Sequence, residues 1–117
     1  MRHRKKTVIL GRKKGPRVAL LKNLAASVIL YEKIITTTAK ANAVRPIVER
    51  FITMSKNPTL TTRRLLLSRL NNPFAVAKLL EVLGLRFKDR KGGYTRIVKT
   101  NRRVGDGGKM AAISLVE

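Results

Sequence analysis

The chain contains no cysteine, which excludes a disulfide framework and metal sites built from thiolates. One histidine and six scattered acidic residues leave little material for acid–base catalysis, and no histidine is expected to activate any of the serines. The longest apolar run, Leu24–Leu30, is too short to span a bilayer. The sequence therefore predicts a protein with no catalytic site, no metal or other cofactor, no small-molecule substrate and no membrane partner.

Positive charge is what the chain has in excess. It holds 27 Lys and Arg residues against 6 Asp and Glu, so its net charge is +21 over 117 residues. This length is typical of one domain, and a hydrophobic content of 44% can supply a core. So much charge repels itself unless a polyanion offsets it, and nucleic acid is the commonest polyanion. Composition alone thus predicts a nucleic-acid partner.

The charge is densest at the N-terminus. Residues 1–17 carry eight cations and no acid, and a segment of this composition cannot bury enough apolar surface to fold by itself. We divide the chain into a basic RNA-binding arm over residues 1–15 and one globular domain over residues 16–117. Counterion release favours binding of such an arm to phosphates, so we expect it to order only on binding. The alternative is a solvated tail without a ligand.

Apolar periodicity and turn signals predict the elements of the globular domain. Helical spacing predicts four helices, at about 16–31, 38–56, 59–70 and 73–83. β-Branched or alternating segments predict three short strands, at 33–37, 94–100 and 110–116. The last two strands flank a turn-rich loop and are expected to form a hairpin. The fold class predicted is therefore α+β: a compact domain of about four helices with a small sheet.

Several residues indicate where these helices begin and end. Thr38 is a suitable N-cap, and Asn72 followed by Pro73 is a strong start signal. Pro46 falls inside the second helix, so we expect a kink or a late helix start there. Gly84 is expected to end the fourth helix as a left-handed cap.

Aromatic residues are scarce, at 4% of the chain. Tyr31, Phe51 and Phe74 lie on helical stripes and are expected in the core, whereas Phe87 and Tyr94 could stack on a base. Five rings are too few for a sheet platform that reads single-stranded bases. Recognition through shape and phosphates is therefore the prediction.

Two groups of residues are candidate phosphate contacts. Arg63 and Arg64 lie on a short helix that cannot bury every arginine it carries, although a merely solvated face is about as good an explanation. Cations also surround the predicted hairpin, where Arg96 and Lys99 are three apart on a strand and so point to opposite faces. At least one face of this hairpin must therefore stay partly uncovered. Its glycines allow backbone to approach a ligand, although plain turn geometry explains each of them too.

The same residues resemble a known family, the seventeenth ribosomal protein of the bacterial large subunit. The resemblance rests on Met1-Arg2-His3-Arg4-Lys5, on the run 34–41 (IITTTAKA), on the run 90–97 (RKGGYTRI), and on 103–106 (RVGD) followed by 110–117 (MAAISLVE). It covers nearly the whole chain in order. Asn42 stands where the family usually has a basic residue, and Pro46 where it usually has no proline.

The resemblance implies a structural, non-enzymatic constituent of the large ribosomal subunit in the cytoplasm, which supports subunit assembly and translation. It implies binding to 23S-type rRNA, close to the mouth of the peptide exit tunnel, with neighbouring ribosomal proteins as further partners. The candidate RNA-binding residues are Arg2, His3, Arg4, Lys5, Lys6, Arg12, Lys13, Lys14, Arg17, Lys40, Arg63, Arg64, Arg90, Lys91, Gly92, Gly93, Tyr94, Arg96, Arg102 and Arg103.

Two other classes of function fit the sequence less well. A DNA-binding regulator of the helix-turn-helix type needs polar, base-reading residues on its recognition helix, and the segment 73–83 is rich in Leu and Val instead. A membrane-surface protein needs a helix with a strongly basic face opposite an exposed apolar one, and no predicted helix has that pattern.

Overall fold

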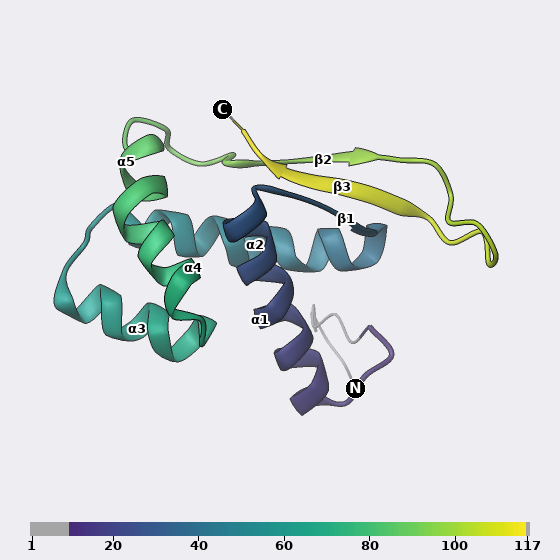
Figure 1. Ribbon diagram of the computed structural model, residues 1–117, viewed down its shortest axis with the longest axis horizontal. Helices are drawn as coiled ribbons and strands as arrows, with labels where there is room; N and C mark the ends of the chain where they lie inside the picture. Colours follow the sequence, from purple (N-terminus) through teal and green to yellow (C-terminus); the bar gives the residue numbers. More distant parts are fainter. Residues whose placement is uncertain (1–9, 117) are drawn as a thin grey trace, which may run out of the picture.

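The computed structural model describes residues 10–116, and these form an α+β fold, as predicted (Figure 1). The elements in chain order are α1 (Lys14–Tyr31), β1 (Lys33–Thr37), α2 (Thr38–Ser55), α3 (Leu60–Leu70), α4 (Pro73–Lys78), the π-helical turn η1 (Leu79–Leu83), α5 (Gly84–Arg86), β2 (Thr95–Lys99) and β3 (Met110–Leu115). The predicted N-terminal arm lies largely outside the described residues.

Side-chain caps explain where three helices begin. The hydroxyl of Thr59 accepts a hydrogen bond from the Thr62 N–H at 3.2 Å, and the Asn72 side chain accepts from two backbone N–H groups at 3.1 Å. The cap of α2 is Thr37 rather than Thr38, so that prediction was one residue off. Because α2 starts at Thr38 and continues through Pro46, the late start considered for it is wrong.

The three strands form one antiparallel sheet in the order β1-β3-β2. The predicted hairpin of β2 and β3 is confirmed, and β1 pairs with the other side of β3. The register aligns Ile34, Ile113 and Ile97 across the sheet, so these three side chains share one face. That face packs against the core, which is built largely on α1 and α2 below the sheet in Figure 1.

Gly84 does not end a helix, so its prediction as a left-handed cap is wrong. Its φ is −58°, and the helix continues from Pro73 through the wide turn η1 to Arg86. The reason for glycine is space: a Cβ at this position would lie 2.5 Å from the carbonyl oxygen of Ser55. The missing side chain lets this helix approach the C-terminal end of α2.

The helical aromatics divide between core and surface. Phe51 is buried as predicted, but Tyr31 and Phe74 are 73% and 78% exposed, so their assignment to the core was wrong. Tyr31 is the last residue of α1 and Phe74 lies in the first turn of α4. The apolar periodicity of a helix continues to its ends, whereas the neighbouring elements that bury its apolar side do not reach that far.

Candidate nucleic-acid interface

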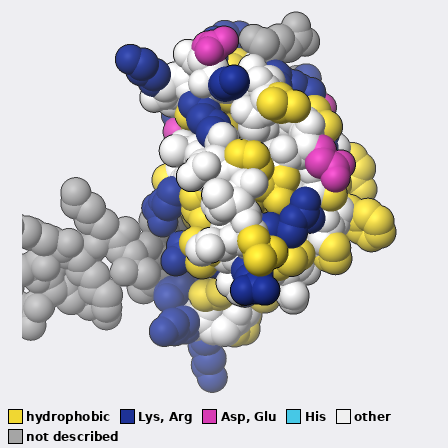
Figure 2. All heavy atoms as spheres, turned by 90° about the vertical axis from the view of Figure 1, so that its left-hand side faces the viewer, with side chains coloured by type: hydrophobic (Ala, Val, Ile, Leu, Met, Phe, Trp, Pro, Cys, Tyr) yellow, Lys and Arg dark blue, Asp and Glu magenta, His cyan; other side chains and the backbone are white. Residues whose placement is uncertain are grey.

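Few of the described cations have an acidic partner. Among residues 10–116 the ion pairs join Glu32 to Lys78 and Arg86, Glu49 to Arg45, and Asp106 to Arg103. The other lysines and arginines in that range form no ion pair. Figure 2 shows dark blue Lys and Arg side chains spread over the side where α3 and α5 lie, with far fewer acidic ones. The surface is therefore positive because its charges are mostly uncompensated.

The arginines of α3 all face outward. Arg63, Arg64 and Arg69 are exposed while Leu66 and Leu70 of the same helix are buried. This confirms that the helix cannot bury its cations. Leu60, Leu65 and Leu67 are exposed beside them, so the outer side of α3 is both basic and apolar.

The loop between β2 and β3 is held by a two-point ion pair. The guanidinium of Arg103 donates to both oxygens of Asp106, at 3.0 and 2.5 Å, and the Gly108 N–H donates to the same carboxylate at 3.0 Å. These contacts hold the pKa of Asp106 well below its usual range. Gly107, with a φ of +67°, completes the turn by accepting a bond from Arg102. Arg103 therefore stabilises the conformation of the loop and also contributes positive charge to it.

Tyr94 is not available to stack on a base, because it is only 2% exposed. Phe87 is equally buried and lies against it, with ring centroids 5.2 Å apart. The Tyr94 hydroxyl donates to the carbonyl of Arg90 at 3.2 Å, and the Lys56 ammonium donates to the same carbonyl. Base stacking by either ring is therefore excluded in this fold, and Tyr94 instead fixes the backbone that carries Arg90.

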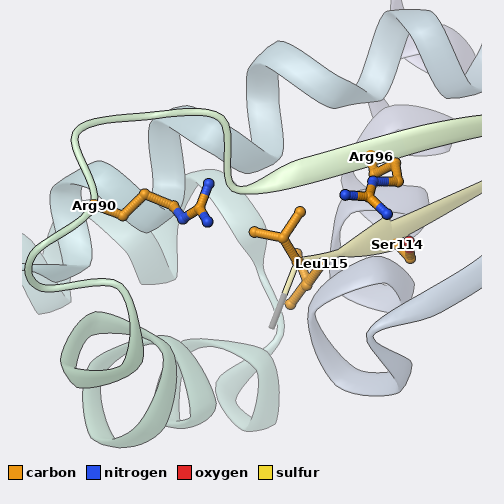
Figure 3. Close-up of a pocket in the computed structure, with 5 residues that line it drawn as sticks. Arg90, Arg96, Ser114 and Leu115 are labelled. Atoms are coloured by element: carbon orange, nitrogen blue, oxygen red, sulfur yellow. The ribbon is translucent and has the colours of Figure 1, made fainter.

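Two open hollows bring hairpin cations together. The first, of about 430 Å³, is lined by Arg90, Arg96, Ser114, Leu115 and Val116 (Figure 3). The second, of about 410 Å³, is lined by Thr38, Lys99, Thr100, Arg102, Lys109 and Met110. Sequence reasoning missed Ser114 and Lys109. Alternation along the strand indicates which face of the sheet Ser114 occupies. Its neighbours on that face follow only from the register between β2 and β3.

The remaining candidates are dispersed. Arg12, Lys13 and Lys14 are exposed at the start of α1, and Arg17 is half-buried. Lys40 is half-buried in the first turn of α2, and Lys91 is exposed. Gly92 and Gly93 have φ of +133° and +61° with open space around them, so the turn itself requires glycine. Arg2, His3, Arg4, Lys5 and Lys6 lie outside the described residues.

The described part of the chain offers no group of three or more His, Cys, Asp or Glu residues that could hold a metal ion. None of its helices is both long and apolar enough to cross a membrane.

Comparison with known proteins matches residues 20–116 to the family described as Ribosomal protein L17. The chain belongs to the ribosomal protein L17 family. It is 53% identical to the large ribosomal subunit protein bL17 of Wolbachia sp. subsp. Drosophila simulans, over 100% of this chain and 84% of the relative. The protein of the same name from Solibacter usitatus is 51% identical over 99% of this chain and 77% of its own length. The one from Phocaeicola vulgatus is 46% identical over 100% and 72%.

Membership confirms the resemblance seen in the sequence. L17 proteins are structural ribosomal proteins and not enzymes, so the candidate interface has to be understood as a surface for assembly rather than for catalysis.

Proposed function

We propose that the protein binds the rRNA of the large ribosomal subunit through phosphate and shape contacts, near the mouth of the peptide exit tunnel. As a member of the L17 family it is a structural component of that subunit, in the bacterial cytoplasm, and takes part in translation. The binding to rRNA and the position in the particle are the parts of this statement that need a test.

The observation that carries the proposal is the set of exposed cations without acidic partners on a well-packed fold. They lie on α3, around the hairpin and at the start of α1. Each phosphate that they neutralise releases counterions, which supplies affinity independent of base sequence. The buried Phe87 and Tyr94 argue against base stacking, so shape and backbone contacts remain as the mode of recognition.

Exposed apolar side chains support contacts with neighbouring ribosomal proteins as well. Phe74 and Leu85 are 78% and 70% exposed on the helical run from α4 to α5, and Tyr31 is exposed at the end of α1. Rings and large aliphatic chains of this kind are enriched where proteins meet. These contacts are the second part of the proposed assembly role.

The decisive experiment measures binding of the full chain to large-subunit rRNA and to a DNA duplex at several salt concentrations. We expect tighter binding to the rRNA than to the DNA duplex, a preference that persists as salt is raised although both affinities fall, and cosedimentation with large subunits through a high-salt wash. Equal affinity for DNA and rRNA, together with loss from subunits in the wash, would support a nonspecific polyanion binder instead. A thiol introduced by Leu85→Cys, in a chain with no other cysteine, allows cross-linking to a nascent peptide to test the tunnel position.

A further inference from the structure

The outer face of the three-stranded sheet is uncovered, and its side chains are arranged by chemical type. The inner face carries the isoleucines that pack on α1 and α2, whereas the alternate residues point away from the core. In Figure 1 no described helix lies above the sheet on that side. Ala112 is 7% exposed yet does not belong to the core cluster, as expected for a small residue of the central strand on the outer face.

Cross-strand pairing arranges this outer face in rows. Lys33 and Arg96 are both paired with Ser114, so a cation, a hydroxyl and a second cation lie side by side across the strands. The next outer row consists of Ile35, Ala112 and Val98, of which Ile35 and Val98 are 62% and 53% exposed. A basic row and an aliphatic row therefore run in parallel across an open sheet.

The basic row ends in the hollow that contains Arg90. The guanidinium groups of Arg90 and Arg96 point toward the end of β3 from two sides, with Ser114 close to Arg96 (Figure 3). Arg90 is held in place because its carbonyl accepts from Tyr94 and Lys56 and its side chain donates to Gly93 at 3.3 Å. Within residues 10–116, neither Arg90, Arg96 nor Lys33 has an acidic partner.

We propose that this outer face binds the sugar–phosphate backbone of an RNA strand that crosses the sheet. Phosphates lie against Lys33 and in the Arg90–Arg96 hollow, the Ser114 hydroxyl donates to a phosphate oxygen between them, and the aliphatic row contacts riboses. Neighbouring strands are about 4.8 Å apart, so Lys33 and Arg96 stand about 10 Å apart at the backbone and can serve separate phosphates. The inference rests on the proposed rRNA binding and assigns it a surface.

The positive charge of the outer face favours RNA over a protein as its ligand. The face presents three cations and a hydroxyl donor, and no described acidic side chain belongs to either of its two rows. Planar guanidinium groups match phosphate oxygens with two parallel hydrogen bonds, and a hydroxyl is a common additional phosphate contact. Aliphatic side chains without an exposed aromatic ring suit the sugar edge of a strand better than stacked bases.

The first test removes charge from the row and leaves a flexible, polar side chain at each position. The variant Lys33→Gln/Arg96→Gln is compared with Arg50→Gln/Lys88→Gln, which removes two exposed cations that lie outside the row and its hollow. Against large-subunit rRNA at 0.1 M salt, the row variant should lose about tenfold or more in affinity, with a salt slope shallower by roughly 0.7–0.9 per lost contact. The control variant should stay close to wild type. Equal losses in the two folded variants would overturn the assignment and leave only net charge.

The second test asks what lies over the face. The cysteine-free chain accepts a single iron chelate at Ile35→Cys on the outer face, with Leu85→Cys on α5 as the comparison. In reconstituted large subunits, hydroxyl radicals generated at position 35 should cleave the rRNA at a short, defined segment. Absence of cleavage from position 35, or capture of a neighbouring protein there by a short cross-linker, would overturn the proposal. Failure of the wild-type chain to bind rRNA at all would instead refute the proposed function itself.

Discussion

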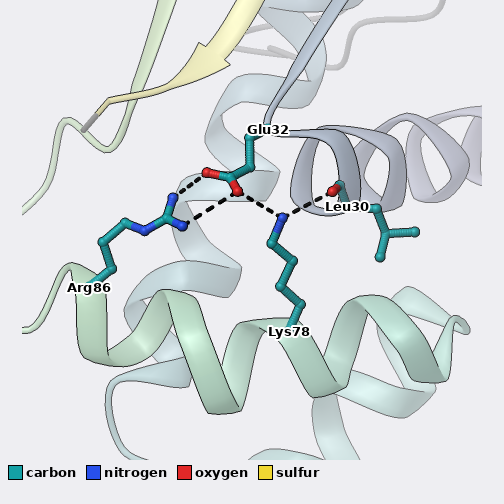
Figure 4. Close-up of polar contacts among 4 residues, drawn as sticks. All are labelled: Leu30, Glu32, Lys78 and Arg86. Carbon is teal, nitrogen blue, oxygen red and sulfur yellow. Dashed lines mark hydrogen bonds and ion pairs between the residues drawn. The ribbon is translucent and has the colours of Figure 1, made fainter.

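The ammonium group of Lys78 lies 3.0 Å from the carboxylate of Glu32, and this contact joins α4 to the end of α1 (Figure 4). Lys78 also donates to the carbonyl of Leu30 at 3.0 Å, which satisfies a backbone acceptor in the last turn of α1. Glu32 has a φ of +61° and forms a second ion pair, with Arg86. One acidic residue in an unusual backbone conformation thus joins three helical segments.

This ion-pair cluster predicts a loss of stability in acid. Hydrogen bonds from Arg86 and Lys78 lower the pKa of Glu32 from 4.5 to about 2. A carboxyl whose pKa is lowered by folding contributes stability above its unfolded pKa and loses it as the pH falls toward the folded value. The melting temperature should therefore drop between about pH 4.5 and 2. The variant Glu32→Gln should melt lower at pH 6 and change less over that window; a parallel decline in the two proteins would assign acid sensitivity to other groups.

The close approach at Gly84 predicts that even a methyl group is costly there. In Gly84→Ala the new Cβ would meet the backbone carbonyl of Ser55, which cannot move without displacing the end of α2. We expect a loss of about 1–3 kcal/mol in the free energy of unfolding, measured by urea titration. Gly15→Ala is the matched control, since nothing beyond its chain neighbours and the backbone of its own helix lies within 4 Å of its Cβ position, and it should be neutral or slightly stabilising. Equal stability of the two variants would refute the packing role of Gly84.

The loop between β2 and β3 contributes both positive charge and a conformation held by the Arg103–Asp106 pair, and two variants are needed to separate these contributions. Replacing Arg102 and Arg103 by Ala should weaken binding to large-subunit rRNA and make the salt slope shallower by roughly 0.7 per lost phosphate contact. The globular fold should survive, because both side chains are exposed, although the loop itself loses the Arg103–Asp106 pair.

Asp106→Ala is the informative companion variant. It removes a negative charge, so electrostatics alone would raise the affinity for rRNA. If the Arg103–Asp106 pair holds the loop in its binding shape, affinity falls instead, and hydrogen exchange at the Gly107 and Gly108 amides accelerates. Increased affinity with unchanged exchange would show that Arg103 acts only through its charge.

The net charge of +21 predicts that salt stabilises the free protein. Like charges repel at low ionic strength, and added ions screen that repulsion. The melting temperature should rise between dilute buffer and 0.5 M salt, and rise further when a polyanion binds the folded chain. A melting temperature indifferent to salt would mean that self-repulsion is already relieved within the fold.

The elements that the sequence predicted best are those that depend on residues close together in the chain. Asn72 caps a helix through its own side chain, and the β2–β3 hairpin follows from alternation around a glycine-rich loop. Three features depend on residues distant in sequence and escaped prediction. The Gly84 contact requires the end of α2, the Tyr94 ring is placed by contacts with Thr53 and Lys56, and the basic and aliphatic rows require the register of β1 on β3.

The residues of the candidate interface also divide into those that the sequence could predict and those that depend on the tertiary fold. Composition showed that many cations had to be exposed, and Arg63 and Arg64 are. Only the fold shows that Arg103 is already paired with Asp106 and that Ser114 lies between two cations. Pairing and grouping are properties of tertiary structure, so residue type alone could not assign them.

The order of the strands also sets when the protein can fold. The central strand β3 is the last of the described elements, and it joins residues as distant as Lys33 and Ser114. While the chain is being synthesised, β1 and β2 have no partner between them, so the apolar side of the sheet cannot close until β3 has emerged. Such late, non-local pairing slows folding and leaves strand edges open to other chains. A chain truncated before Met110 is therefore left with two unpaired strands and an uncovered core, a clear substrate for chaperones and proteases.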